Sequence, residues 1–244
     1  MFVYEFCRRG KKHLMTGNAN EDAVKAITAG NATMIFVADG MGSAERAETA
    51  ARTTVDIASK VTPWIFMPHP MWSDSSASFA IQSAFAAAYN ALQHIARGNK
   101  ALLDQLQTTF MGVIYNASSR TLTWGHCGDG GIIGLDEDGR LVPITRRQKG
   151  EHAWETTSIL DPSSWRFGVV ERDVKAFAMM TDGLLDRFCP YDTIDQGSYE
   201  ATSLKRLLML PENASGRLLS TWLDRLFDPE RDRKEHTSEL QSRI

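Results

Sequence analysis

The chain contains 244 residues, of which 43% are hydrophobic, and it carries a formal net charge of −3 at pH 7. This length and composition allow a substantial core in one large domain or two small ones. Lysine and arginine are spread along the chain rather than gathered in blocks, which argues against nucleic-acid binding. No run approaches the roughly 18 apolar residues of a membrane span, and the basic N-terminus lacks the apolar segment of a signal peptide. We therefore expect neither nucleic acid nor membrane as a partner.

The three cysteines, Cys7, Cys127 and Cys189, lie far apart in the sequence. Their odd number and wide spacing match neither a disulfide framework nor a zinc site. A reducing compartment is the simplest setting for such thiols, so we expect a cytoplasmic location.

The first half of the chain combines strand and helix patterns. Apolar alternation and apolar runs predict strands at residues 2–7, 23–27 and 34–38. Helical spacing predicts long helices at 44–61 and 76–96. Pro63 is expected to end the first of these helices, because proline cannot continue the hydrogen-bond ladder.

The second half is dominated by strand patterns. Consecutive antiparallel strands are predicted at 108–115, 121–127, 131–135 and 140–144, with hairpin turns at 116–120 and 136–139. Residues 149–166 are interpreted as an exposed excursion, 173–181 as a further strand, and 204–210 and 215–227 as helices. The order of elements predicts an α+β fold in which two antiparallel sheets pack as a sandwich with helices on the outer faces.

Acidic residues recur where apolar strands end. The run over residues 34–38 leads to Asp39 and Gly40, so a carboxylate projects from a rigid strand while glycine lets the backbone approach a ligand. A second apolar run, over residues 176–180, leads to Asp182 in the same manner. Other acidic residues stand beside small residues at a strand edge or in a glycine-flanked turn: Glu21, Asp22 and Asp129.

These carboxylates are suited to hard cations, which prefer oxygen ligands. If they converge at one end of the sandwich, their repulsion is costly unless cations neutralise it. Two divalent ions roughly 3.5–4 Å apart are a common arrangement for activating water against a phosphate ester. No cysteine or serine stands in a pattern typical of a covalent nucleophile. A single Asp-Gly is most often only a turn, so the hypothesis depends on the joint arrangement.

Together these motifs resemble those of the metal-dependent type 2C (PPM) serine/threonine protein phosphatases. The resemblance extends from about residue 10 to 227, and two loops, at residues 10–22 and 148–156, are similar to a bacterial subset of the family. The motifs that carry it, in chain order, are Asn20-Glu21-Asp22-Ala23, Val37-Ala38-Asp39-Gly40-Met41-Gly42, Thr108-Thr109, Gly125-His126-Cys127-Gly128-Asp129 and Thr181-Asp182-Gly183-Leu184.

The resemblance implies a binuclear Mn²⁺ or Mg²⁺ centre at one end of a two-sheet sandwich. It implies that Asp39 bridges two ions, that Asp22, with Glu21 beside it, and the Gly40 carbonyl hold one of them, and that Asp182 holds the other. Asp129 would belong to a third, weaker metal position. Asp39, Asp22 and Asp182 are then the catalytic set, which activates a water for attack on the phosphorus of a phosphorylated protein.

Two departures from the family pattern bear on function. Gly17 stands where many members have a phosphate-gripping arginine, and Lys11, Lys12 and His13 are the candidates to replace it; we assign phosphate binding to Lys12 and His13. The terminal strand that carries the family's last metal-binding aspartate has no counterpart. We interpret residues 1–234 as a phosphatase-like domain and 235–244 as a non-native tail, because the tail reads like a translated sequencing adapter.

Two functions remain open from the sequence. The first is metal-dependent hydrolysis of phosphoserine and phosphothreonine on proteins, opposing a cognate serine/threonine kinase in a bacterial signalling pathway. The second, favoured by the two departures, is a non-catalytic phosphatase-like binding or regulatory module.

Overall fold

A computed structural model describes residues 3–7, 15, 17, 19–66, 74–148, 156–170, 174–189, 193–210 and 221. The first half of the chain forms β1 (Asp22–Ala29), β2 (Ala32–Asp39), α2 (Ala47–Phe66), α3 (Asp74–Ala96) and α4 (Lys100–Asp104). The second half forms β3 (Phe110–Asn116), β4 (Thr121–Cys127), β5 (Gly131–Asp136), β6 (Leu141–Pro143), the 3-10 turn η1 (Pro162–Ser164), β7 (Arg166–Val170), β8 (Val174–Met180), α5 (Asp182–Phe188) and α6 (Tyr199–Leu208).

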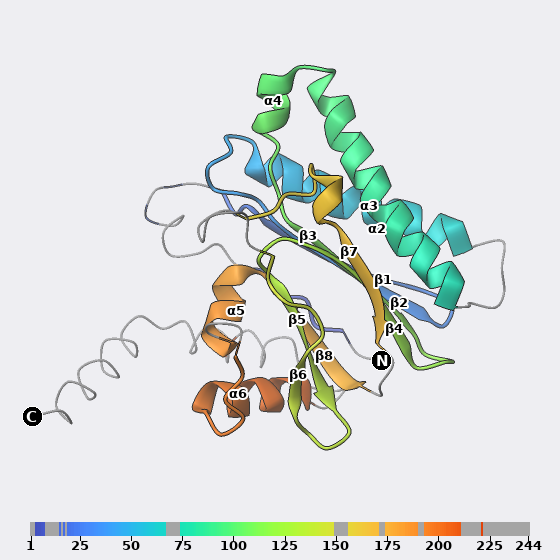
Figure 1. Ribbon diagram of the computed structural model, residues 1–244, viewed down its shortest axis with the longest axis vertical. Coiled ribbons are helices and arrows are strands. Elements are labelled where there is room, and N and C mark those ends of the chain that lie inside the picture. Colours follow the sequence, from blue (N-terminus) through green and yellow to red (C-terminus); the bar gives the residue numbers. More distant parts are fainter. Residues whose placement is uncertain are drawn as a thin grey trace, which may run out of the picture.

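The strands form two antiparallel sheets, with α2 and α3 lying over the larger one (Figure 1). The larger sheet has the order β1-β2-β3-β4-β7, and the smaller has the order β6-β5-β8. Neighbours in the chain are mostly neighbours in a sheet, because short turns connect antiparallel strands.

Buried apolar side chains occupy three successive layers. One layer lies between α2, α3 and the larger sheet, and a second contains Val37 and Val113 of the larger sheet with Ile132 of the smaller. The third joins the smaller sheet to α5 and α6. The predicted α+β sandwich with helices on its outer faces is therefore confirmed. Residues 34–38 of β2 are all apolar because both faces of the strand are covered: Phe36 faces the helices, and Val37 faces the second sheet.

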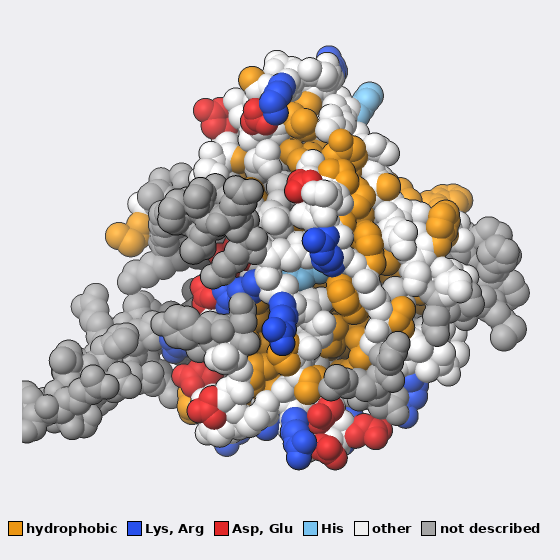
Figure 2. Space-filling model, viewed as in Figure 1, with side chains coloured by type: hydrophobic (Ala, Val, Ile, Leu, Met, Phe, Trp, Pro, Cys, Tyr) orange, Lys and Arg blue, Asp and Glu red, His pale blue; other side chains and the backbone are white. Residues whose placement is uncertain are grey.

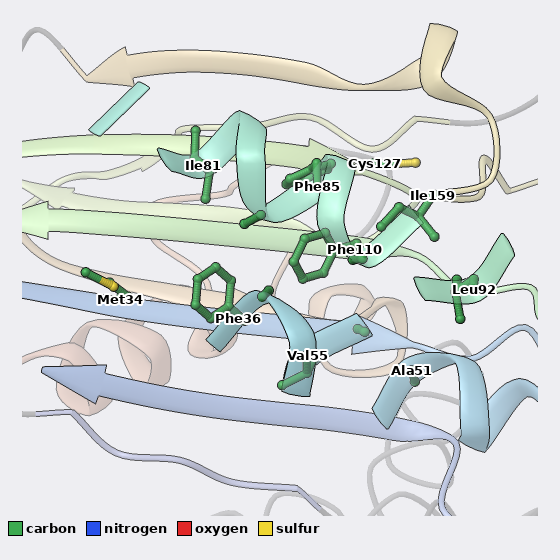
Figure 3. Packing of buried hydrophobic residues seen from close by; sticks show 14 of the residues in the cluster. Met34, Phe36, Ala51, Val55, Ile81, Phe85, Leu92, Phe110, Cys127 and Ile159 are labelled. Atoms are coloured by element: carbon green, nitrogen blue, oxygen red, sulfur yellow. The ribbon is translucent and has the colours of Figure 1, made fainter. Parts of the chain in front are cut away.

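Aromatic side chains fix α3 to the larger sheet (Figure 3). The Phe85 ring lies 4.5 Å from the Phe110 ring between centroids, and its edge contacts with Trp165 and Phe167 have centroid distances of 5.6 and 5.0 Å. Paired aromatic rings add stabilisation beyond the area that they bury. This cluster holds the ends of β3 and β7 under one helix.

The structure corrects the expectation for Pro63. Helix α2 continues through Pro63 to Phe66. A proline removes one backbone donor, and a position so close to the helix end disturbs only the last turn. The neighbouring Thr62 is buried, and its hydroxyl donates to the Ala58 carbonyl at 2.7 Å, so the turn before the proline is retained.

Other local predictions also differ from the structure. Residues 3–7 form no strand; Glu5 instead accepts a hydrogen bond from the backbone of Ala26 in β1. Residues 149–166 were expected to form an exposed excursion, but β7 begins at Arg166, pairs with β4 and is partly buried against Phe85. Helices α4 and α5 were not predicted. Helix α6 begins earlier than expected because Ser198 caps it, accepting from the Ala201 N–H at 3.1 Å.

Two further expectations concern the surface. Within the described parts of the chain, no helix is long and apolar enough to cross a membrane. The acidic run at residues 136–138 lies at the tip of the β5–β6 hairpin, and acidic side chains gather there at the lower end of the face shown in Figure 2. The same view shows a band of hydrophobic side chains along the region of α3 and β7.

The helix predicted at 215–227 and the tail at 235–244 lie outside the described residues, except for residue 221.

Candidate metal centre

Strand pairing brings the first two candidate carboxylates together. Asp22 begins β1 and Asp39 ends β2, and the antiparallel register places them directly opposite each other. Directly opposed positions have side chains about 4.5–5.5 Å apart at Cβ, which is unfavourable for two like charges. The turn that joins these strands is at the far end, so both carboxylates lie at one end of the larger sheet.

The backbone around Asp39 is fixed by two buried threonines. The Asp39 N–H donates to Thr109 Oγ1 at 3.0 Å, while the Asp39 carbonyl accepts from the Thr109 N–H at 2.8 Å and from Thr108 Oγ1 at 2.9 Å. Thr108 and Thr109 are only 0% and 3% exposed. The Thr108-Thr109 motif therefore fixes the backbone from which the Asp39 carboxylate projects.

Gly40 continues this arrangement. Its N–H donates to the Glu21 carbonyl at 3.0 Å, and it forms a β-bridge with Thr108. A Cβ at this position would lie 2.7 Å from the carbonyl carbon and oxygen of Ala47, so no larger residue fits without displacing the start of α2. Glu21 is half-buried beside this glycine.

Asp182 reaches the same place from the smaller sheet. It is the first residue of α5, immediately after β8, and its side chain hydrogen-bonds with the Asp39 carboxyl. Burial, followed by the charges of Asp22 and Asp182, raises the pKa of Asp39 to about 9, and Asp129 contributes in the same direction. Carboxylates from four separate segments of the chain thus share one electrostatic neighbourhood.

Asp129 lies in the turn between β4 and β5. Gly128 adopts a φ of 123°, and a Cβ there would be 2.5 Å from Thr109 Cβ, so the turn packs tightly against the threonine that also holds Asp39. The Thr156 hydroxyl donates to Asp129 Oδ2. Burial is the largest cause that raises the pKa of Asp129.

The donor set fits hard divalent cations in its chemistry, because it consists of carboxylate and backbone oxygens. Crowding of like charges around Asp39 is the observation that a cation would relieve. Among the described residues, however, no group of three or more His, Cys, Asp and Glu side chains is close enough to enclose an ion. Electrostatic interaction extends farther than coordination, so the carboxylates form an open cluster rather than a closed cage. Lys12 and His13 lie outside the described residues.

The nearby histidine and cysteine are buried and do not face solvent. His126 is 1% exposed, and burial lowers its pKa to about 4. Burial raises the pKa of Cys127 to about 11, and its thiol lies 3.1 Å from the Ser164 hydroxyl. A neutral thiol without access to substrate cannot act as a nucleophile. This agrees with the absence of a nucleophile motif in the sequence.

Three residues around Asp129 were missed as site residues. Thr156 and Gln148 belong to a loop whose sequence resembles the bacterial subset, which was a usable signal. Arg147 had none, because an isolated arginine in a loop is ordinarily a solvated surface residue. In the structure its side chain is only 8% exposed.

One protein family matches the sequence over most of its length. The model of the family described as "Protein phosphatase 2C" matches residues 9–227. No protein of curated function matches the sequence closely enough to count as a relative.

Solved structures share the fold at low sequence identity. The serine/threonine phosphatase Stp1 from Staphylococcus aureus is 15% identical with a TM-score of 0.64, covering 92% of this chain and 90% of its own. The catalytic domain of the serine/threonine protein phosphatase PstP, solved with two manganese ions, is 20% identical with a TM-score of 0.61, covering 86% and 87%. A bacterial serine phosphatase is 16% identical with a TM-score of 0.60, covering 86% of each chain.

Proposed function

Because this chain belongs to the protein phosphatase 2C family, we propose that it hydrolyses phosphoserine and phosphothreonine on proteins with a metal-activated water. The observation that carries this proposal is the convergence of Asp22, Asp39 and Asp182 at one end of the sandwich. The two manganese ions of the PstP structure support divalent cations as the cofactor class. We assign Mn²⁺ or Mg²⁺, with two ions at the main centre and a third, weaker position.

The chain's own residues would hold these ions as follows. Asp39 lies opposite Asp22 in the β1–β2 register and is affected by the charge of Asp182, which supports a bridging role for its carboxylate. Asp22 and the Gly40 carbonyl, with Glu21 beside them, would hold one ion, Asp182 the other, and Asp129 the third. When bound, two divalent cations supply the positive charge that lowers the pKa of an attacking water.

The protein's role in the reaction would be to orient the water and the phosphate ester and to neutralise charge at the centre. The rigid ends of β2 and β8 fix Asp39 and Asp182, so the water and the phosphate ester meet in a preset geometry. Cys127 is buried and does not serve as a nucleophile. Water would attack phosphorus, the P–O bond to the serine or threonine would break, and a proton released by the water would go to the leaving oxygen. We propose that Lys12 and His13 contact the phosphate in place of the arginine that Gly17 replaces.

A phosphorylated protein is the substrate class that this reaction implies. A cognate serine/threonine kinase, whose product this protein would dephosphorylate, is the expected functional partner. The reaction would then reset a phosphorylation signal.

A second candidate function is a phosphatase-like binding module without catalysis. Gly17 in the place of arginine favours it, as does the open carboxylate cluster among the described residues. Such a module would bind a phosphorylated protein or a cation without turnover.

Hydrolysis of p-nitrophenyl phosphate and of a phosphothreonine peptide separates the two functions. Mn²⁺-dependent turnover that EDTA abolishes supports the phosphatase. Mn²⁺ or phosphopeptide binding without turnover, in protein that is folded by circular dichroism, supports the binding module. A contaminating phosphatase is excluded when Asp39→Asn, purified in parallel, shows no turnover.

A further inference from the structure

Residues 145–148 form a short strap that follows β6 and lies beside the turn carrying Asp129. The Ile144 and Thr145 N–H groups both donate to the Ile132 carbonyl, at 2.8 and 3.2 Å, and Thr145 Oγ1 accepts from the Ile132 N–H at 3.1 Å. The buried Thr145 therefore anchors the strap to β5. From this anchor, the two residues at its end reach toward different parts of the candidate centre.

Gln148 holds the turn of Asp129. Its N–H donates to the Gly128 carbonyl at 2.8 Å, and its Nε2 donates to the His126 carbonyl at 3.2 Å. On the other side its Oε1 accepts from Thr157 Oγ1 at 3.2 Å, next to the Thr156 hydroxyl that donates to Asp129. One side chain thus joins the end of β4 to the segment that contacts the Asp129 carboxylate.

Arg147 holds α5, the helix that begins with Asp182. Its guanidinium pairs with the Asp186 carboxylate through Nη1 and donates to the Cys189 carbonyl through Nη2 at 3.2 Å. The arginine side chain is 8% exposed and that of Asp186 is 64% exposed, so the buried charge belongs to the strap. A two-pronged guanidinium contact fixes direction as well as distance, which a lysine cannot reproduce.

The strap therefore connects the two carboxylates that come from outside the β1–β2 pair. Asp129 depends on the turn that Gln148 holds, and Asp182 depends on the helix that Arg147 holds.

We propose that Arg147 and Gln148 are positioning residues that set the spacing between Asp129 and Asp182 and thereby the affinity of this side of the centre for a divalent cation. This inference rests on the proposed metal-dependent function. Neither residue is a ligand. They act through the turn and the helix that carry the ligands, in the way that residues behind a metal's direct ligands commonly tune its affinity.

The test uses three variants of the full chain. Gln148→Met keeps the side-chain length and the backbone contact to Gly128 but removes the amide bridge between His126 and Thr157. Arg147→Met removes the charge and both guanidinium contacts. Arg147→Lys keeps the charge but cannot make the two-pronged contact. The control is Lys100→Met, which removes the exposed ion pair of Lys100 with Asp104 on α4.

Mn²⁺ binding is measured by calorimetric titration, and phosphatase rates are measured across Mn²⁺ concentration. We expect Gln148→Met and Arg147→Met to weaken the weakest Mn²⁺ site about tenfold or more. The rate at saturating Mn²⁺ should stay within about threefold of the wild-type rate, since a positioning residue can be compensated by mass action. Arg147→Lys should fall between Arg147→Met and wild type, and Lys100→Met should match wild type.

The outcomes separate this inference from the proposed function. Wild-type protein that binds no Mn²⁺ contradicts the proposed function and with it the effect on affinity. Wild-type protein that binds Mn²⁺, together with variants that bind it equally well, overturns the inference and leaves the function standing. Variants that melt at lower temperature with unchanged Mn²⁺ affinity also overturn it, because the strap would then be only structural. Hydrogen exchange of α5 amides in the metal-free protein gives an activity-independent check: faster exchange in Arg147→Met is expected, and unchanged exchange contradicts the strap.

Discussion

Replacement of Asp39 by asparagine should stabilise the metal-free protein while removing its response to Mn²⁺. The pKa of Asp39 rises from 3.8 to about 9 because the carboxyl is buried and surrounded by other carboxylates. At pH 7 the folded, metal-free protein therefore keeps a proton on Asp39 that the unfolded chain releases. The folded state binds more protons between about pH 4 and pH 9, so its stability falls as pH rises through this window.

The size of the effect follows from linkage. About 3 pH units separate 3.8 from pH 7, and each is worth roughly 1.4 kcal/mol, which gives an upper limit of about 4 kcal/mol. Several neighbouring carboxylates share the repulsion that raises the pKa of Asp39, so we assign about half of this to Asp39 alone. Asparagine is neutral, has nearly the same volume, and retains a donor for Asp182. Asp39→Asn should therefore unfold with a free energy about 2 kcal/mol higher than wild type at pH 7 in EDTA.

Urea unfolding between pH 5 and 8 measures this difference, in EDTA and in MnCl₂. In EDTA the advantage of Asp39→Asn should grow with pH. In MnCl₂ the order should reverse, because a ligand present at 100 times its dissociation constant adds about 2.7 kcal/mol to the wild type and little to the variant. Lower stability of Asp39→Asn in EDTA at every pH would refute the electrostatic reasoning, and full phosphatase activity of the variant at saturating Mn²⁺ would refute the bridging role.

Other changes test the scaffold around this carboxylate. Thr109→Val leaves the Asp39 N–H without its acceptor and should cost about 1–3 kcal/mol in urea unfolding, whereas Thr123→Val, at a buried hydroxyl that has no hydrogen-bond partner in the described structure, should cost nothing measurable. Gly40→Ala should lower the free energy of unfolding by about 1–3 kcal/mol, because its Cβ would meet the Ala47 backbone at 2.7 Å; an unchanged melting temperature would show that α2 can move away. Deletion of residues 235–244, the segment that we interpret as non-native, should leave the melting temperature within about 1 °C, and a larger drop would show that the segment packs on the domain.

The elements that the sequence predicted well are those with a strong local signal. Strand β2 carries an unbroken apolar run at residues 34–38 because it is buried on both faces, and its end at Asp39-Gly40 is marked by the carboxylate and the glycine. Strand β7 escaped prediction because it has only five residues and owes its place to Phe167 contacting Phe85, far away in the sequence. Tertiary contacts of this kind leave no periodic pattern.

The candidate site shows the same division. Asp22, Asp39, Asp129 and Asp182 could be predicted as candidates because each follows or precedes a recognisable strand, and the register of β1 with β2 places two of them opposite each other. The positions of Arg147 and Gln148 were not predictable, since their importance comes from the elements that they join and not from their neighbours in sequence. A buried arginine in a loop becomes visible only when its partners in α5 are known.

Diffraction from crystals grown with MnCl₂, with anomalous maps recorded at the manganese edge, tests the binuclear centre most directly. We predict two manganese peaks roughly 3.5–4 Å apart, with the Asp39 carboxylate between them, Asp22 beside one peak and Asp182 beside the other. A fully occupied manganese site elsewhere on the protein, with no peak within coordination distance of Asp39, would contradict the assignment of these aspartates as the metal centre.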